Sequence, residues 1–367
     1  MVVKIDYEHV VKLVNMWYVS IKKRDIEEAI TLRKEIKNSF NDMEENQDVL
    51  LYFSLVDSRY NMMLEEYKKT SEILKSLEKT DIEKKTDDMI QYYYYFFSGV
   101  HAFYEKKYIQ AINFYMIAET KLHKIPDKVE IAEFHYQLAI VFYRIDQHLL
   151  SLNHAIKANE LFKEDTAYVE RTITSKMVIA ANKLDLFQYE DSERHYKEAL
   201  KMAIQNDKPF TIGLVYRNLG LNYARRNLLS KAQETFEKAL SIQEHYDSII
   251  GIKTMFDLSY TFYKKGLKED ARKLYETGNL KAINQNESEH IAKFNLIYAM
   301  YEEYNLNQII ESLDALKKQK LWAEVAELTL DVARYFKKRK DIQNEALFFE
   351  KAHEARDNNL KIMEEIK

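Results

Sequence analysis

Apolar residues recur at helical spacing in three segments near the start of the chain. The three apolar sets are Val10, Val14, Trp17 and Ile21; Ile26, Ala29, Ile30, Ile36 and Phe40; and Tyr52, Leu55, Val56, Tyr60, Met63 and Tyr67. Positions three and four apart lie on one side of an α-helix, so each set predicts one apolar face. Asp25 and Asn46 stand where the N-caps of the second and third helices are expected. Together the faces predict a three-helix bundle over residues 1–70.

A charged stretch separates this bundle from the rest of the chain. Residues 74–89, "LKSLEKTDIEKKTDDM", contain few apolar positions. The change in composition predicts a partly helical linker over residues 71–89 that serves as a hinge. We expect a signal bound by the C-terminal part to change how the bundle packs against it.

From residue 90 onward the apolar pattern repeats. Three sets have the spacing 3, 4, 3, namely Tyr108, Ala111, Tyr115 and Ala118; Tyr189, Ser192, Tyr196 and Ala199; and Leu229, Ala232, Phe236 and Ala239. This small–aromatic–small pattern resembles the tetratricopeptide repeat, in which small residues let paired helices approach and the aromatic residue fills the gap between repeats. A weaker copy at Ser151, Ala155 and Ala158 lies between the first two sets, so successive units are 40 or 41 residues apart, nearer the HEAT or armadillo period. We favour the residue pattern over the period, because a longer connecting loop changes the period at little cost.

The sequence therefore predicts an all-α protein. An N-terminal three-helix bundle is joined by a linker to a right-handed tetratricopeptide-repeat superhelix over residues 90–367, with about six or seven helix pairs. Pro126 and Pro209 fall between units, where helices are expected to break. The inner face of such a superhelix is typically a groove for a peptide or a protein.

Composition agrees with this fold and narrows the partners. The chain has only 6 Gly and 2 Pro among 367 residues, too few for many hairpins. A formal net charge of −4 gives no basic excess, so we expect no nucleic-acid partner. Cysteine is absent, which excludes disulfides and thiol catalysis. The most apolar stretch, "YYYYFFSGVHAFY", has 13 residues, and a membrane span needs about 20. We expect a soluble cytoplasmic protein with no membrane contact.

Motifs of catalysis are mostly missing. The sequence has no Gly-rich phosphate loop, no nucleophile elbow and no zinc motif, and we expect the chain to bind neither a metal nor another cofactor. Glu130 and Glu133 lie one helical turn apart, and a solvated acidic face is the default interpretation. A role as general acid and base would require a pocket around them.

Two polar pairs on predicted inner helices suggest a peptide clamp. Asn182 and Asp185 share a face of one helix, and Asn218 and Asn222 share a face of the corresponding helix in the next unit. An asparagine amide can bind both atoms of a peptide unit, and a carboxylate can bind a peptide Lys or Arg. The alternative is that the amides cap turns or bond neighbouring helices.

Several longer segments carry a more specific resemblance. They are "MEENQDVLLYFSLVDSRY", "YYYYFFSGVHAFYEKKYIQAI", "EIAEFHYQLAIVFYRIDQ", "LDLFQYEDSERHYKEAL" and "KLWAEVAELTLDVARYFKKRKD". In these segments the sequence resembles the Rap family of Bacillus, over nearly the whole chain. The resemblance implies a partner response regulator of the sporulation or competence pathways, and a short secreted and re-imported peptide of the Phr type that inhibits the protein. It implies hydrolysis of the regulator's phosphoaspartate.

The resemblance also assigns residues. Gln47 matches the glutamine that phosphatase members insert into the regulator's active site, where the regulator supplies Mg²⁺. Asn46, Asp48 and Leu50 are expected to contact the regulator beside it, as are Glu133 and Glu130 on the regulator-binding surface.

On the peptide side, Asp185 matches the aspartate that meets a basic peptide residue. Asn218 matches the asparagine that holds the peptide backbone, whereas Asn182 and Asn222 follow from shared faces alone. The usual Tyr-Asn before the Gly is replaced here by Arg217 and Asn218.

A non-catalytic function remains open at this stage. Relatives of the same family grip a DNA-binding regulator and keep it off DNA, and Gln47 alone does not exclude this. A role in the regulatory system of a mobile element belongs to the same alternative.

Overall fold

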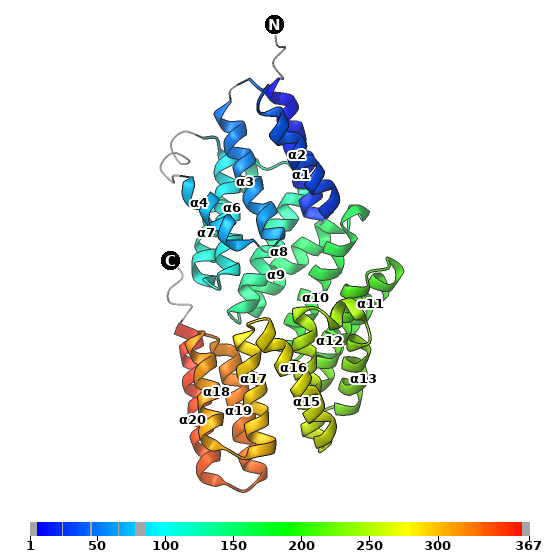
Figure 1. The fold of residues 1–367 in the computed structure, drawn as a ribbon, viewed down its shortest axis with the longest axis vertical. Helices are drawn as coiled ribbons and strands as arrows, with labels where there is room; N and C mark the ends of the chain where they lie inside the picture. Colours follow the sequence, from blue (N-terminus) through cyan, green and yellow to red (C-terminus); the bar gives the residue numbers. More distant parts are fainter. Residues whose placement is uncertain (1–5, 24, 45, 65, 78–85, 362–367) are drawn as a thin grey trace. The chain divides into compact units, whose positions relative to one another are not determined.

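The structure is a computed structural model that describes residues 6–23, 25–44, 46–64, 66–77 and 86–361 (Figure 1). Every regular element within these residues is a helix, so the predicted all-α class is confirmed. The first helices are α1 (Tyr7–Lys23), α2 (Ile26–Ser39), α3 (Gln47–Met63) and α4 (Tyr67–Ser76). The chain then forms α6 (Asp88–Tyr104), α7 (Tyr108–Lys121), the 3₁₀ turn η1 (Leu122–Lys124), α8 (Lys128–Arg144), α9 (His148–Phe162) and the 3₁₀ turn η2 (Thr166–Tyr168).

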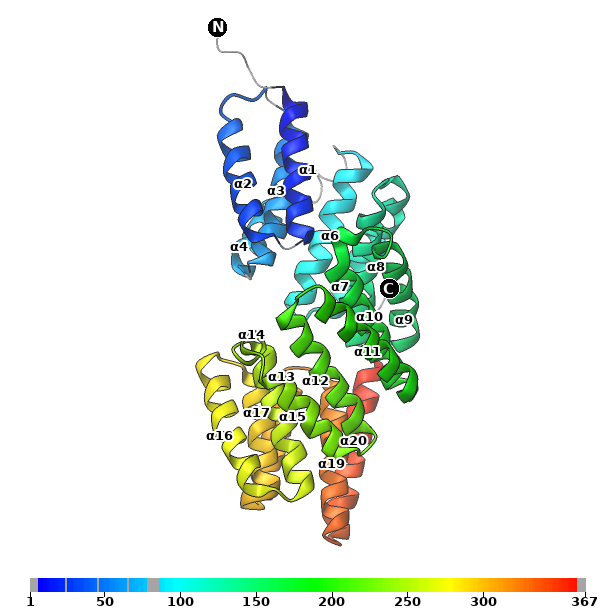
Figure 2. The same ribbon diagram turned by 90° about the vertical axis from the view of Figure 1, so that its right-hand side faces the viewer.

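The remaining helices complete the repeats. They are α10 (Val169–Asp185), α11 (Tyr189–Gln205), α12 (Pro209–Arg225), α13 (Leu229–Leu240), α14 (Gln243–Tyr246), α15 (Ile249–Lys265), α16 (Lys268–Asn284), α17 (Ser288–Tyr298), the π-helical turn η3 (Ala299–Glu303), α18 (Leu306–Lys318), α19 (Trp322–Lys338) and α20 (Ile342–Lys361). Neighbouring helices such as α15, α16 and α17 lie side by side (Figure 2). None of the described helices is long and apolar enough to cross a membrane.

Local signals fix the start of the bundle helices. The Asp25 carboxylate accepts a hydrogen bond from the Glu28 N–H, and the Asn46 side chain accepts from the Asp48 and Val49 N–H groups, so both predicted N-caps are confirmed. These bonds satisfy amides that a helix start leaves without intrahelical partners. Around the buried Trp17, the Phe53 ring stacks at 5.3 Å.

The predicted linker begins with a packed helix. α4 covers residues on both sides of the expected bundle end at residue 70, and the Thr70 hydroxyl donates to the Ser58 carbonyl of α3 at 3.2 Å. Leu74 is buried and the Tyr67 ring lies 5.0 Å from that of Tyr104 in α6. The first part of this charged stretch is therefore packed against α3 and α6, because the few apolar residues on one face of α4 are sufficient to hold it there. Residues 78–85 of the predicted linker lie outside the described residues.

The repeat pattern is confirmed as core packing. Ala111, Tyr115 and Ala118 are fully buried, as are Ala232, Phe236 and Ala239 in a later repeat. Pro209 is the first residue of α12, where its missing N–H leaves no helical bond unmade. The chain divides into two compact units, the first running to Arg144 together with Lys157–Tyr168, and the second formed by Ile145–Ile156 and the chain from Val169 on.

Close approach of paired helices depends on glycines set against buried aromatic rings. A Cβ on Gly99 would lie 2.5 Å from the Tyr115 ring, and one on Gly220 would lie 2.4 Å from the Phe236 ring. In both pairs the aromatic residue follows the glycine by 16 positions, on the next helix. Both distances are far below van der Waals contact, so a side chain at either glycine would push the two helices apart.

Gly220→Ala should therefore destabilise the second unit, although alanine is the better helix former. We expect the free energy of unfolding to fall by about 1–3 kcal/mol, because the added methyl overpacks a closed core. Urea denaturation followed by circular dichroism measures this. Adding Phe236→Leu should recover part of the loss, and stability equal to or above that of wild type would contradict the close approach.

Candidate functional site

Gln47 is the first residue of α3 and its side chain is exposed. The cap made by Asn46 fixes the backbone next to it, because that amide oxygen accepts from two N–H groups at 3.1 and 3.2 Å. Asn46 therefore fixes the backbone at the start of α3, next to Gln47. The Asp48 side chain is exposed. The side-chain amide of Gln47, the predicted catalytic group, is therefore carried by the rigid start of a helix.

One face of α3 remains open beyond Gln47. Leu50, Leu51 and Ser54 are partly exposed, while Val49, Tyr52 and Phe53 are buried in the bundle. Positions 47, 50, 51 and 54 follow the spacing of one helix face. From Leu55 to Met62 the helix is buried all round, so the open face is confined to its first two turns.

Glu130 and Glu133 do not lie on a surface. Their exposed fractions are 0% and 2%, so the expected solvated acidic face is wrong, and neither can touch a protein partner as the chain is folded here. Helical spacing alone missed this, because α8 is covered by helices distant in the sequence. Glu130 accepts hydrogen bonds from the hydroxyls of Tyr18 and Tyr92, each at 3.1 Å.

A buried lysine completes this polar cluster of the first unit. The Lys22 ammonium, 3% exposed, lies 3.4 Å from Glu130 and 2.8 Å from Asp127. Lys22 and Tyr18 belong to α1, Tyr92 to α6 and Glu130 to α8. The cluster therefore joins the bundle to the first repeats.

Electrostatics support a charged pair with neutral tyrosines around it. Burial raises the pKa of the Glu130 carboxyl, partly opposed by Lys22 and by the Tyr18 hydrogen bond. Burial by itself would lower the pKa of Lys22, but Glu130 and Asp127 outweigh it and raise that pKa above its usual value. Burial, reinforced by Glu130, raises the pKa of Tyr18 and Tyr92, so both hydroxyls stay protonated donors.

In the second unit, two of the predicted clamp residues are structural. Asn182 and Asn222 are both 0% exposed. The Asn182 amide donates to the Ser151 hydroxyl at 2.7 Å, and the Asn222 amide donates to the Tyr189 carbonyl at 3.0 Å. The peptide-binding role predicted for these two is wrong for this fold, and the alternative, that they bond neighbouring helices, describes them.

Asp185 and Asn218 are the two clamp residues that remain accessible. Both are partly exposed, at the end of α10 and within α12. Within the described part of the chain, no hydrogen bond engages the Asn218 amide, so its donors and acceptor are available. Beside it, the Arg217 guanidinium forms an ion pair with Asp257 at 2.9 Å.

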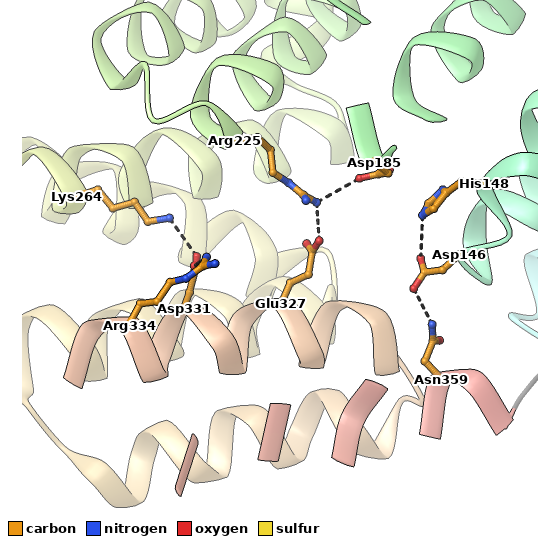
Figure 3. A network of polar contacts seen from close by, with 9 residues as sticks. All are labelled: Asp146, His148, Asp185, Arg225, Lys264, Glu327, Asp331, Arg334 and Asn359. Carbon is orange, nitrogen blue, oxygen red and sulfur yellow. Dashed lines mark hydrogen bonds and ion pairs between the residues drawn. The ribbon is translucent and has the colours of Figure 1, made fainter. Parts of the chain in front are cut away.

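Asp185 belongs to a network that sequence reasoning missed (Figure 3). The Arg225 guanidinium lies 3.3 Å from Asp185 and 2.5 Å from Glu327, which bridges α12 to α10 and α19. No periodic signal could pair Arg225 with Glu327, because they are 102 residues apart.

The same face continues along α19. Asp331, one turn beyond Glu327, accepts from the Lys264 ammonium at 3.1 Å and from the Tyr260 hydroxyl at 2.8 Å. On the other side of Arg225, Asn359 of α20 donates to Asp146 at 2.6 Å. Polar residues thus line the face built by α10, α12, α15 and α19, which suits a charged, flexible ligand better than an apolar one.

Comparison with known proteins gives a consistent set of matches. The family model of the N-terminal region of response regulator aspartate phosphatase H matches residues 4–65, and a tetratricopeptide-repeat model matches residues 171–245. Response regulator aspartate phosphatase I of Bacillus subtilis (strain 168) is 30% identical, covering 96% of this chain and 92% of that protein. Regulatory protein RapF of the same organism is 29% identical, covering 94% of this chain and 93% of that protein.

Solved structures match over the same extent. A Rap protein complexed with competence and sporulation factor has a TM-score of 0.90 at 30% identity, covering 97% of this chain and 99% of that one. The Rap conjugation gene regulator of plasmid pLS20, in complex with the Phr* peptide, has a TM-score of 0.74 at 28% identity, covering 99% of each chain.

Lys22→Met should destabilise the first unit strongly, because it leaves Glu130 buried without its cation. At pH 7 we expect the free energy of unfolding to fall by about 3–5 kcal/mol. The pKa of Glu130 is already raised in the folded state, so protonation at lower pH relieves the penalty, and the loss should shrink as pH falls toward about 4. Chemical denaturation at several pH values measures both effects.

Two matched variants sharpen this test. Lys238→Met removes a cation from an exposed pair with Glu234, whose side chains are 52% and 65% exposed, and should cost far less stability than Lys22→Met. Glu130→Gln added to Lys22→Met removes the buried charge and should restore most of the stability. Equal costs for the two lysine variants would argue against a buried ion pair.

Proposed function

Because this chain belongs to the Rap family of response regulator aspartate phosphatases and their regulatory relatives, we propose that it hydrolyses the aspartyl phosphate of a cytoplasmic response regulator of the sporulation phosphorelay. A short signalling peptide inhibits it. The observation that carries the catalytic part is Gln47, an exposed amide on a capped helix start. The phosphatase names of relatives at about 30% identity support the same reaction.

A single amide is sufficient for this chemistry. An aspartyl phosphate is an activated acyl phosphate, and its Mg²⁺ is held by the response regulator, so the partner has only to place a water in line with the phosphorus. The Gln47 carbonyl accepts from that water while its N–H₂ donates to a phosphoryl oxygen. A carboxylate at this position would repel the phosphate and lack the donor.

The open face of α3 provides the contact surface for the regulator. Leu50 and Leu51 follow Gln47 on that face and are partly exposed, so both can pack against a partner without unfolding the bundle. The buried neighbours Val49, Tyr52 and Phe53 keep the helix fixed in the bundle. Binding and positioning thus come from one rigid element, which favours a fixed water geometry.

Peptide binding is assigned to the face of the second unit that carries Asp185 and Asn218. Two similar proteins were solved with peptides bound. The partly exposed Asn218 amide, which has no hydrogen-bond partner among the described residues, can hold a peptide unit at both of its polar atoms. Asp185 supplies a carboxylate for a basic peptide side chain, although Arg225 occupies it in the present structure.

A non-catalytic role is the second candidate. Relatives named only as regulatory proteins, RapK, RapF and RapG, are as similar to this chain as those named phosphatases, at 29–30% identity. In this case the chain sequesters a DNA-binding response regulator. A gel-shift assay distinguishes the two, because loss of operator binding by an unphosphorylated regulator favours sequestration.

Gln47→Ala should reduce phosphate release from a phosphorylated sporulation regulator by about 100-fold, the cost of one transition-state hydrogen-bonding group. Binding of the regulator should change little, because the amide acts mainly in the transition state. Gln243→Ala is the matched control, since Gln243 is also an exposed first residue of a helix, α14 in the second unit. Equal rates for wild type and Gln47→Ala would end the catalytic assignment.

Asn218→Ala should weaken binding of the inhibitory peptide by about 5- to 100-fold, the range expected for hydrogen bonds to a buried backbone unit. Regulator binding should be intact, because α12 carries none of the residues assigned to it. Isothermal titration with the peptide and with the regulator gives both affinities. Asn206→Ala is the control, because the exposed Asn206 amide donates to the Met202 carbonyl of its own helix. Peptide affinity that falls equally in both variants would contradict a specific clamp.

A further inference from the structure

Three carboxylates lie along one polar face of the second unit (Figure 3). Asp146, Asp185 and Glu327 come from three segments, and we call them the carboxylate trio. Arg225 forms ion pairs with two of them, Asp185 at 3.3 Å and Glu327 at 2.5 Å. The third, Asp146, lies 3.9 Å from the His148 ring and accepts a hydrogen bond from Asn359.

The charges of the trio influence one another. Burial and the nearby Asp185 raise the pKa of the Asp146 carboxyl, and His148 is the main group that opposes this shift, with a smaller contribution from Arg225. Arg225 is therefore the direct counter-ion of Asp185 and Glu327, and it also acts on Asp146 from a distance.

The arginine is held loosely enough to leave. Its side chain is 41% exposed and that of Glu327 is 60% exposed. An ion pair open to water in this way contributes little, because both charges remain well solvated when they separate. The Asp185 side chain, in contrast, is only 14% exposed, so a cation that reaches it from a bound ligand is better shielded from water.

A second observation supports a peptide ligand at this face. The free Asn218 amide lies seven residues before Arg225 on α12, two helical turns and about 10 Å away on the same face. That is about the length of three residues of extended chain. A peptide held by its backbone at Asn218 can therefore bring a side chain to the position of the Arg225 guanidinium.

We propose that Arg225 is an internal occupant of the ligand's cation subsite, which a Lys or Arg side chain of the peptide displaces from Asp185 and Glu327 on binding. The inference rests on the peptide-binding function proposed above and adds Glu327 and Arg225 to its site. Displacement has two consequences. First, the peptide must compete with Arg225 of the same chain, which lowers its apparent affinity. Second, the Arg225 bridge between α12 and α19 opens only when a cationic ligand replaces it.

The test compares the chain with Arg225→Met and with Arg226→Met. Methionine keeps much of the side-chain volume without the charge. Arg226 is the matched control, because it follows Arg225 directly in the chain and pairs with Glu190 and Glu193, outside the trio. An equimolar pool of random pentapeptides is selected on each full-length protein and read by mass spectrometry, and the most enriched peptide is titrated beside a version with citrulline or norleucine in place of its Arg or Lys.

We expect selection of peptides with a Lys or Arg. The enriched peptide should bind Arg225→Met about two- to fivefold more tightly than wild type, the range that an exposed ion pair supports, and the gain should fade at high salt. Arg226→Met should bind as wild type does, and the neutral peptide should not distinguish the proteins.

Two results would overturn the inference while leaving peptide binding in place. One is equal or weaker binding of the cationic peptide by Arg225→Met, and the other is selection without enrichment of Lys or Arg. If neither wild type nor Arg225→Met enriches any peptide, the peptide-binding function itself fails and the inference fails with it.

Discussion

The buried contact between Lys22 and Glu130 is the interaction on which the first unit depends. A charge taken out of water is costly, and it is tolerated only where an opposite charge and hydrogen-bond donors meet it. Glu130 receives Lys22 and Tyr18 from α1 and Tyr92 from α6. Because the partners come from separate helices, the cluster can form only when the bundle and the first repeats pack correctly together.

Helix α3, which carries the candidate catalytic residue Gln47, is held against the same helices. The Tyr52 hydroxyl donates to Asn15 of α1 at 2.8 Å, and its ring lies 5.4 Å from that of Tyr93 in α6. α3 is thus fixed on both sides only five residues beyond Gln47. Its first two turns, which carry the open face, are continuous with a segment held by this hydrogen bond and this ring contact. A rigid base is what a residue that positions one water requires.

The second unit has a closely packed interior and a separate polar face. Alanines, glycines and aromatic rings close the interior, as in the contact of Gly220 with Phe236. Polar side chains of α10, α12, α15 and α19 are then left to meet one another on the opposite side, where Asp185, Arg225 and Asp331 form their ion pairs. Such a face can exchange one partner for another because its contacts are partly exposed, whereas the interior cannot. A sensor for a charged peptide needs this combination of a fixed core and replaceable surface contacts.

The sequence by itself determined what depends on near neighbours in the chain. It determined the helices, the caps at Asp25 and Asn46, the small–aromatic–small repeats and the exposed start at Gln47, because helical spacing and capping are local. It also identified, by resemblance, the family to which the chain belongs. Only the tertiary structure decided which polar residues are buried: Glu130 looked solvent-facing from its spacing, the spacing of Asn182 and Asn222 left a peptide clamp and a structural role open, and packing by other helices buried all three. The pairing of Arg225 with Glu327 likewise exists only in the fold, because an ion pair requires proximity in space, and no local pattern specifies which distant charges will meet.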